Sequence, residues 1–253
     1  MNLNCNPALG EHHKSPSQRV KSITEGWFTA EGYCLNCTSP HLNATTPGTP
    51  FCDHICPRCA QRYELKSAQQ AHTRTVQDGG YDSMMREIRA QNLPALMLLQ
   101  YDPTWSVRRL LAVHPVFLTP NVVRKRERAL TARPDYWMCS LDLTVIPPDG
   151  KIIVVGDGKA LPTAETRKAF QNSKRFEDIP LAKRGWPALV LSLVRKSGKE
   201  YFTIDDIMRF EEQMHAAYPE NSHKREKVRQ QLQVLMALGY IDRVSPGEFK
   251  VLL

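Results

Sequence analysis

Two pairs of cysteines constrain this chain more than any other feature. Cys34 and Cys37 form one C-x2-C pair, Cys56 and Cys59 form a second, and residues 38–55 separate the two pairs. Four thiolates at this spacing match the ligand set of one tetrahedral zinc ion, and they leave no coordination position open for catalysis. The alternative to a zinc site is that the four cysteines are free or redox-active. The spacing predicts a structural zinc site that joins the two pairs.

An acidic pattern brackets the second cysteine pair. Asp53 precedes it, and Glu64, Leu65 and Lys66 follow it. Two carboxylates on adjacent extended segments can hold Mg²⁺ together with the carbonyl of Leu65, and they leave positions open for a phosphate oxygen and a water. Lys66 lies two residues after Glu64, so it shares a strand face with Glu64 and can orient the water or offset charge. Although such residues also alternate on ordinary exposed strands, the context favours a site for phosphodiester hydrolysis.

The composition favours a polyanionic partner. The formal net charge is +8 and the isoelectric point is about 9.2, which suits DNA, although many proteins that bind no nucleic acid are equally basic. No apolar run is long enough for a transmembrane helix, and residues 1–14 lack the pattern of a secretory signal. Cysteines at metal spacing fit a reducing compartment. We therefore expect a cytoplasmic protein with no membrane partner.

Residues 1–180 are expected to form an α+β domain. Apolar residues at three- and four-residue spacing predict an amphipathic helix over residues 15–31, and residues 82–91 also have a helical pattern. Extended segments are expected around Asp53 and at residues 62–67, 95–101, 110–118 and 151–155. This mixture predicts a small sheet with helices packed on it.

Residues 181–253 have the element order of a winged helix. One helix is predicted over residues 186–194 with Pro187 at its first position, and a second over residues 203–218 behind a capping box. A third is predicted to begin with Ser222 as its cap and to end at Gly239. Two short strands, residues 240–244 and 248–252, follow it.

The start of the third helix carries the residues that we expect to contact DNA. Residues 221–229 are strongly basic and lie where a recognition helix would enter a major groove. Basic helix ends are often merely solvated, but the helix order and the net charge favour DNA binding. The candidate contacts are Ser222, His223, Lys224, Arg225 and Arg229.

Short segments along nearly the whole chain resemble the DpnI and Dam-replacing family of restriction endonucleases, which cut only methylated DNA. The segments are Ile23-Thr24-Glu25-x-Trp27, Tyr33-Cys34-x-Asn36-Cys37, Asp53, Cys56-x-x-Cys59, Glu64-Leu65-Lys66-Ser67, Asp78-Gly79-x-Tyr81, Met84-Met85, Thr131-Ala132-Arg133, Arg184-Gly185-Trp186 and Arg229-Gln230-Gln231-Leu232-Gln233. The resemblance implies a PD-(D/E)xK nuclease domain with an inserted four-cysteine zinc site, followed by a C-terminal winged-helix domain.

The resemblance also implies roles for individual residues. Asp53, Glu64 and Lys66 take the catalytic positions, and the four cysteines hold zinc. Trp137 corresponds to a tryptophan that contacts the methyl groups, although the segment Arg133-Pro-Asp-Tyr-Trp137 is one residue shorter than in the family. The alternative role for Trp137 is core packing.

Together these features predict a Mg²⁺-dependent bacterial type II endonuclease that is monomeric in solution. Its expected substrate is double-stranded DNA at GATC sites containing N6-methyladenine, with both domains reading the methylated site. One alternative is a nuclease with a different methylation dependence or target. Another is a zinc-containing winged-helix regulator that does not cut, but a regulator has no need of Asp53, Glu64 and Lys66 together.

Overall fold

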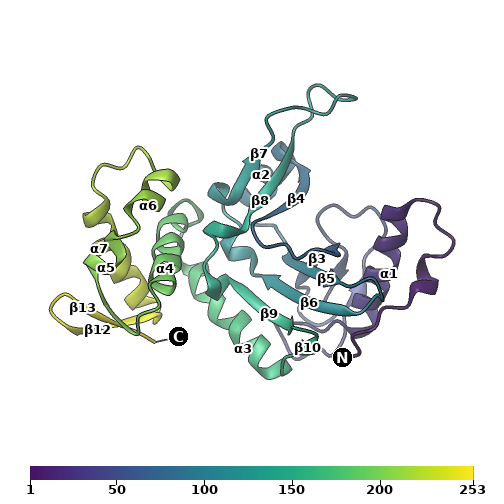
Figure 1. Cartoon of the computed structure of the whole chain (residues 1–253), viewed down its shortest axis with the longest axis horizontal. Coiled ribbons are helices and arrows are strands. Elements are labelled where there is room, and N and C mark those ends of the chain that lie inside the picture. The colour runs from purple at the N-terminus through teal and green to yellow at the C-terminus, as the bar shows by residue number, and fades with distance from the viewer. Residues whose placement is uncertain (253) are drawn as a thin grey trace.

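A seven-stranded sheet forms the centre of the larger part of the protein, in a computed structural model that describes residues 1–252 (Figure 1). The strand order is β1-β2-β3-β5-β6-β9-β10, and within it β3 and β5 pair in parallel while the other described neighbours pair antiparallel. The strands are β1 (Asn43–Ala44), β2 (His54–Ile55), β3 (Arg62–Ala68), β5 (Ala95–Tyr101), β6 (Val107–Val113), β9 (Lys151–Gly156) and β10 (Lys159–Ala160). The sheet is larger than the sequence predicts, because short edge strands extend it on both sides.

Both faces of this sheet are covered. Alternate residues of β5 enter two different apolar clusters: Ala95, Met97 and Leu99 lie in one, and Leu96 and Leu98 lie in the other. This division follows from the two-residue period of a strand. The continuous apolar sequence of β5 is therefore that of a central strand with no solvent-facing side.

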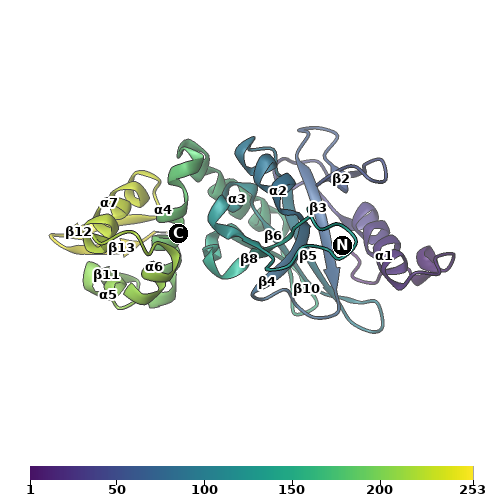
Figure 2. The ribbon, with the colours of Figure 1, turned by 90° about the horizontal axis from the view of Figure 1, so that it is seen from above.

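Two helices cover one face of the sheet. Helix α1 (Pro16–Glu31) packs on β3, and α3 (Thr163–Ser173) packs on β9. The buried residues of α1 are Ile23, Thr24, Trp27 and Phe28, whose spacing confirms the predicted amphipathic helix. Figure 2 shows α1 at the end of the molecule farthest from the C-terminal region.

A second, three-stranded sheet lies against the other face. It has the order β4-β8-β7 and comprises β4 (Thr75–Gly80), β8 (Met138–Asp142) and β7 (Val123–Lys125). Helix α2 (Tyr81–Arg89) follows β4 directly and contacts all three strands. Figure 1 shows that the segment between β7 and β8 projects from the body of the protein; we call residues 126–137 the β7–β8 arm.

One predicted strand is shorter than expected. The sequence predicts a strand over residues 110–118, whereas β6 ends at Val113. The chain then enters a 3-10 helix, Pro115–Phe117, and the ring of His114 accepts a hydrogen bond from the backbone of Val116. Pro115 has no backbone N–H for a sheet ladder, so the strand cannot continue through it.

The C-terminal region has helices followed by the predicted hairpin, together with a short strand at residues 201–203 that the sequence did not predict. Its three-stranded sheet has the order β11-β13-β12. The elements are α4 (Gly185–Ser197), β11 (Tyr201–Thr203), α5 (Ile204–Met208), α6 (Glu211–Ala217), α7 (Lys224–Ala237), β12 (Ile241–Ser245) and β13 (Glu248–Val251). Gly239, with φ +71°, follows the end of α7 as the sequence predicts.

Three local predictions in this region are wrong. The helix expected over residues 203–218 is two helices, α5 and α6, although its capping box at Thr203 and Asp206 is present. Ser222 does not cap the third helix: α7 begins one residue later than a Ser222 cap would require, behind His223. Pro187 is the third rather than the first residue of α4, where its missing N–H is still harmless.

The two regions are packed against each other. Arg195 of α4 forms a two-bonded ion pair with Asp149, at 2.5 and 2.9 Å. Arg175 donates to the carbonyls of Leu238 and Gly239 at the end of α7. One apolar cluster extends from the β4 strand to β13 of the C-terminal sheet, so the regions share buried surface.

Candidate active site and metal centre

A hairpin of β2 and β3 brings the predicted acidic residues together. The register pairs His54 with Tyr63, and the backbone N–H of Asp53 donates to the carbonyl of Tyr63 at 2.9 Å. The Oδ2 atom of Asp53 then accepts a hydrogen bond from the backbone N–H of Leu65 at 2.8 Å. Asp53 therefore lies beside Glu64 and Leu65 although ten residues separate Asp53 from Glu64 in the sequence.

Lys66 lies on the same face of β3 as Glu64. Its Nζ atom is 2.6 Å from Oε1 of Glu64, and their side chains are 25% and 13% exposed. The side chain of Asp53 is 18% exposed. The three predicted residues thus converge at one partly buried position that solvent can still reach.

A third carboxylate reaches Lys66 from the other sheet. Asp78 of β4 accepts from Lys66 Nζ through Oδ1 at 3.0 Å, and its side chain is only 2% exposed. Sequence reasoning assigned no role to Asp78, although it stands in one of the segments quoted above. No spacing rule connects it with Lys66, because the two residues belong to different sheets.

Helix α1 contributes a further pair beside Asp53. Lys21 Nζ lies 3.3 Å from Oε1 of Glu25 and 3.8 Å from Oδ1 of Asp53. Sequence reasoning missed this pair as well. The only local signal is that Lys21 and Glu25 are four residues apart and so share one helix face.

The crowding of charge shifts several pKa values. Burial, followed by the charge of Asp78, raises the pKa of Glu64 to about 7. Burial, followed by the charge of Asp53, raises the pKa of Glu25 to about 7. Burial opposes the charged form of Lys66, but the carboxylates of Glu64 and Asp78 outweigh it and raise the pKa of Lys66. Carboxylates are therefore crowded together at this site, and a divalent cation would offset their negative charge.

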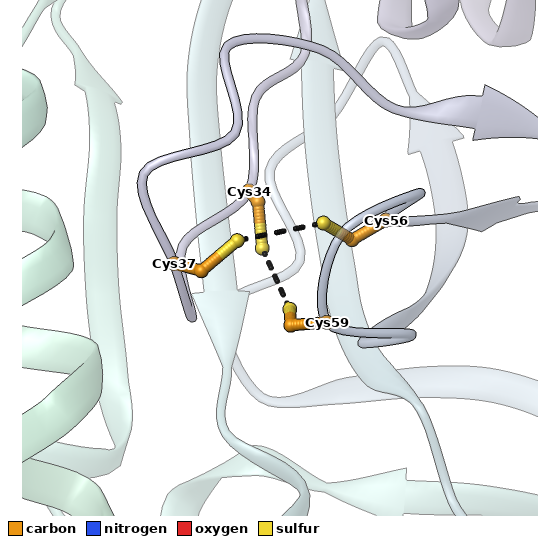
Figure 3. A group of neighbouring side chains, drawn as sticks. All are labelled: Cys34, Cys37, Cys56 and Cys59. Atoms are coloured by element: carbon orange, nitrogen blue, oxygen red, sulfur yellow. Dashed lines mark hydrogen bonds between the residues drawn. The ribbon is translucent and has the colours of Figure 1, made fainter.

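The four predicted cysteines form one cluster (Figure 3). Their sulfur atoms all lie within 4.8 Å of one another, with Cys34 and Cys59 at 3.5 Å and Cys37 and Cys56 at 3.6 Å. Four sulfurs at about 2.3 Å from one tetrahedral ion would lie about 3.8 Å apart. The spacing and the all-thiol donor set therefore fit zinc.

Backbone groups support the sulfur atoms. The N–H groups of Ser39 and Arg58 point at the sulfurs of Cys37 and Cys56, each at 3.4 Å. Such bonds stabilise thiolates and orient them toward a metal. Within the described residues the other cysteines, Cys5, Cys52 and Cys139, are buried and lie outside the cluster.

The cysteine cluster is connected to strand β3, which carries Glu64 and Lys66. The hydroxyl of Tyr63, which precedes Glu64, accepts from the backbone N–H of Leu35 at 2.9 Å and lies 3.3 Å from the sulfur of Cys34. Arg167 of α3 donates to the carbonyls of Cys34 and Ser39, both at 2.9 Å. The second C-x2-C pair is itself the loop of the β2–β3 hairpin, so a metal there holds the hairpin that aligns Asp53 with Glu64.

Trp137 lies at the base of the β7–β8 arm, directly before β8. Its ring is half-buried, and its carbonyl accepts a hydrogen bond from the N–H of Tyr81 at 2.7 Å. The neighbouring ring of Tyr136 lies over Gly80, where even a methyl group would approach it to 2.6 Å. Trp137 is thus anchored through its backbone and keeps part of its ring accessible.

The predicted recognition surface is at the start of α7. Ser222, His223 and Arg229 are exposed, and Ser222 and His223 line a groove of about 900 Å³. Arg225 forms an ion pair with Asp205 of α5 at 2.6 Å, and Lys224 donates a hydrogen bond to the carbonyl of Asn221. The groove is lined by Ala217, Tyr218, Pro219, Glu220, Asn221, Ser222, His223, Glu226, Lys227 and Gln230.

Comparison with known families gives two matches that together cover nearly the whole chain. Residues 1–178 match the family model described as DpnI, Dam-replacing family. Residues 182–251 match the model described as the Dam-replacing HTH domain. Separately, none of the helices within residues 1–252 is long and apolar enough to cross a bilayer.

Proposed function

Because the chain belongs to the DpnI, Dam-replacing family, we propose that it is a methylation-dependent type II restriction endonuclease of the PD-(D/E)xK class. Its substrate is double-stranded DNA at GATC sites that contain N6-methyladenine. Residues 1–180 form the nuclease domain and residues 181–253 the winged-helix domain of a monomer. The observation that supports this most directly is the convergence of Asp53, Glu64 and Lys66 at the β2–β3 hairpin.

Asp53, Glu64 and the carbonyl of Leu65 are the proposed ligands of Mg²⁺. Carboxylate and carbonyl oxygens are the donors that this hard cation prefers, and Asp53, directly before β2, lies beside Glu64 of the paired strand β3. When bound there, Mg²⁺ would neutralise phosphate charge and favour deprotonation of a water. The ligand set leaves room for both phosphate and water because it uses only three positions.

Lys66 is the proposed positioned cation of the reaction. Hydrolysis adds a water oxygen to phosphorus and breaks one phosphorus–oxygen ester bond. An ammonium beside Glu64 can hold the water by hydrogen bonding and offset the charge that develops on the phosphate oxygens. Its raised pKa keeps Lys66 protonated, so its proposed role is electrostatic rather than that of a general base.

Two separate surfaces are proposed to read the methylated site. Trp137, at the base of the β7–β8 arm, offers an apolar ring to the adenine methyl groups. The start of α7 offers Ser222, His223, Lys224, Arg225 and Arg229 to the major groove or to phosphates. The proposed zinc at the four cysteines is structural, since four thiolates complete its coordination.

The test is digestion of one plasmid prepared with and without adenine methylation, in the presence of Mg²⁺. We expect cleavage of the methylated plasmid only, at GATC sites. The Asp53→Asn variant should bind the methylated duplex without cutting it, and Ca²⁺ should support binding with little cutting because its geometry is looser.

Each failure has a distinct meaning. Binding of methylated DNA by the parent protein without any cleavage would identify a regulator instead of a nuclease. Equal cleavage of both plasmids would refute the methylation dependence. Cleavage by Asp53→Asn at the parent rate would remove Asp53 from the mechanism.

A further inference from the structure

Asp78 is a buried carboxylate that the proposed reaction leaves without a role. It lies on β4, in the three-stranded sheet, whereas Glu64 and Lys66 lie on β3 of the seven-stranded sheet. Its side chain nevertheless extends to the site, and it is more deeply buried than that of Glu64, at 2% against 13% exposure.

The hydrogen bonds of Asp78 make it dependent on Lys66. Oδ1 accepts from Lys66 Nζ at 3.0 Å and from the backbone N–H of Gly79 at 2.7 Å. Oδ2 is buried and has no hydrogen-bond partner in residues 1–252. A buried carboxylate with an unpartnered oxygen is unfavourable for folding, and the ammonium of Lys66 is what offsets its charge. An unsatisfied buried polar group calls for an explanation, and a role at the adjacent site is one such explanation.

Lys66 is shared between two carboxylates. Its ammonium is 2.6 Å from Glu64 and 3.0 Å from Asp78. Glu64 is a proposed Mg²⁺ ligand, and a carboxylate that donates to a metal interacts less strongly with a neighbouring ammonium. The side chain of Asp78 is buried, so water does not replace it as a partner of Lys66. Asp78 therefore remains the second carboxylate that is paired with Lys66.

We propose that Asp78 is the positioning residue that holds Lys66 at the site while Glu64 binds Mg²⁺. This inference rests on the proposed nuclease function. Without the charge of Asp78, Lys66 pairs with Glu64 alone and competes with Mg²⁺ for that carboxylate. The loss of Asp78 therefore weakens both the placement of the ammonium and the binding of the metal.

The test compares Asp78→Asn with the parent protein and with Asp82→Asn. Asparagine keeps the size of the side chain and an oxygen that can accept from Gly79, but it removes the charge. Asp82 is an exposed carboxylate four residues further on, so its variant controls for a general loss of negative charge. Single-turnover cleavage of a methylated GATC duplex is measured against Mg²⁺ concentration, and duplex affinity is measured in Ca²⁺.

For Asp78→Asn we expect a maximal rate lower by about tenfold or more and a higher half-saturating Mg²⁺ concentration. Its duplex affinity should stay within about twofold of the parent value, since no DNA contact changes. Asp78→Glu, which restores the charge, should recover part of the rate. A purely structural role would reduce the active fraction without moving the half-saturating Mg²⁺ concentration.

A second measurement uses no activity. Lys66→Met leaves Asp78 buried and unpaired, so it should lower the melting temperature of the metal-free protein, and adding Asp78→Asn should raise it again. A double variant no more stable than Lys66→Met would overturn the inference, as would an Asp78→Asn enzyme with parental rate and Mg²⁺ dependence. A parent protein that cuts no methylated duplex would instead overturn the proposed function, and the positioning role with it.

Discussion

The side-chain ammonium of Lys125 lies 4.4 Å from the centroid of the Trp137 ring. The same ammonium lies 5.3 Å from the centroid of the Tyr81 ring, so it is held between two aromatic residues. Lys125 ends β7 and Trp137 precedes β8, and these strands pair at the base of the β7–β8 arm. A cation and an apolar ring are therefore adjacent at the position proposed to meet methylated DNA, and their contributions can be separated.

Replacing Trp137 with alanine should remove the methyl preference of the nuclease domain. Burying one methyl group contributes roughly 0.8 kcal/mol, so reading two methyl groups contributes about a tenfold to twentyfold preference. We expect Trp137→Ala to lose about this factor in affinity for the methylated duplex while its affinity for the unmethylated duplex changes little. Trp137→Phe should retain most of the preference. The measurement is binding of both duplexes in Ca²⁺ at one salt concentration; an unaltered preference would assign Trp137 to packing.

Replacing Lys125 with methionine should have a different signature. The variant keeps the apolar stem of the side chain but removes the charge. We expect weaker binding of both duplexes by a similar factor. The slope of log affinity against log salt concentration should become shallower by about one, because one phosphate contact is lost. The methyl preference should remain. A changed preference with an unchanged salt slope would show that Lys125 acts only by orienting Trp137.

Replacing Cys56 with serine should unfold the region around the cysteine cluster. Structural zinc binding is coupled to folding, so its loss should destabilise the protein by roughly 3 kcal/mol or more. We expect the purified variant to contain well below one zinc ion per chain, and we expect its yield of soluble protein to be much lower than that of the parent. The control is Cys5→Ala, at a buried cysteine outside the cluster, which should keep its zinc. Folded, active parent protein without zinc by elemental analysis would contradict the assignment.

The ion pair between Arg225 and Asp205 gives a matched pair of changes in the C-terminal domain. If Arg225 contacts DNA, Asp205 competes with phosphate for the guanidinium. Arg225→Met should then weaken duplex binding, and Asp205→Asn should strengthen it by about twofold to fivefold, the range of an exposed ion pair. Titrations at several salt concentrations measure both effects. If Asp205→Asn left affinity unchanged, Arg225 would be facing solvent rather than DNA.

The cleavage rate should fall as the pH decreases below about 7. Burial and the charge of Asp78 raise the pKa of Glu64 to about 7, and a protonated Glu64 cannot bind Mg²⁺. Because Mg²⁺ competes with the proton, a higher Mg²⁺ concentration should move the midpoint of the rate profile to lower pH. Single-turnover rates between pH 5.5 and pH 8.5 would measure this (roughly one and a half units to either side of the Glu64 pKa). A midpoint independent of Mg²⁺ would place the titrating group away from the metal ligands.

The same shift has an opposite consequence for the stability of the metal-free protein. Below the ordinary pKa of 4.5 Glu64 is protonated in both states, whereas between 4.5 and about 7 only the folded state keeps the proton. The contribution of Glu64 to the free energy of unfolding is therefore lost as the pH rises through that range. Glu64→Gln should show a flatter stability profile in thermal unfolding without divalent metal.

Local spacing in the sequence was enough to predict the cysteines of each pair in the cluster and the neighbouring positions of Glu64 and Lys66. Each C-x2-C turn brings two thiols together, Cys34 with Cys37 and Cys56 with Cys59, and the fold then brings the two turns together. Glu64 and Lys66 share a face because side chains repeat every two residues along a strand. Within each cysteine pair and along β3, a short stretch of backbone with known geometry determines which groups are neighbours.

Only the tertiary structure decided how these sites are completed. Asp78 reaches Lys66 from a different sheet, and Glu25 with Lys21 reaches Asp53 from a helix. The broken helix at residues 209–210 and the early end of β6 also differ from the prediction, because helix and strand ends depend on packing as well as on propensity. The approach of Asp78 to Lys66 depends on how two sheets pack face to face, and no periodicity within either strand carries that information.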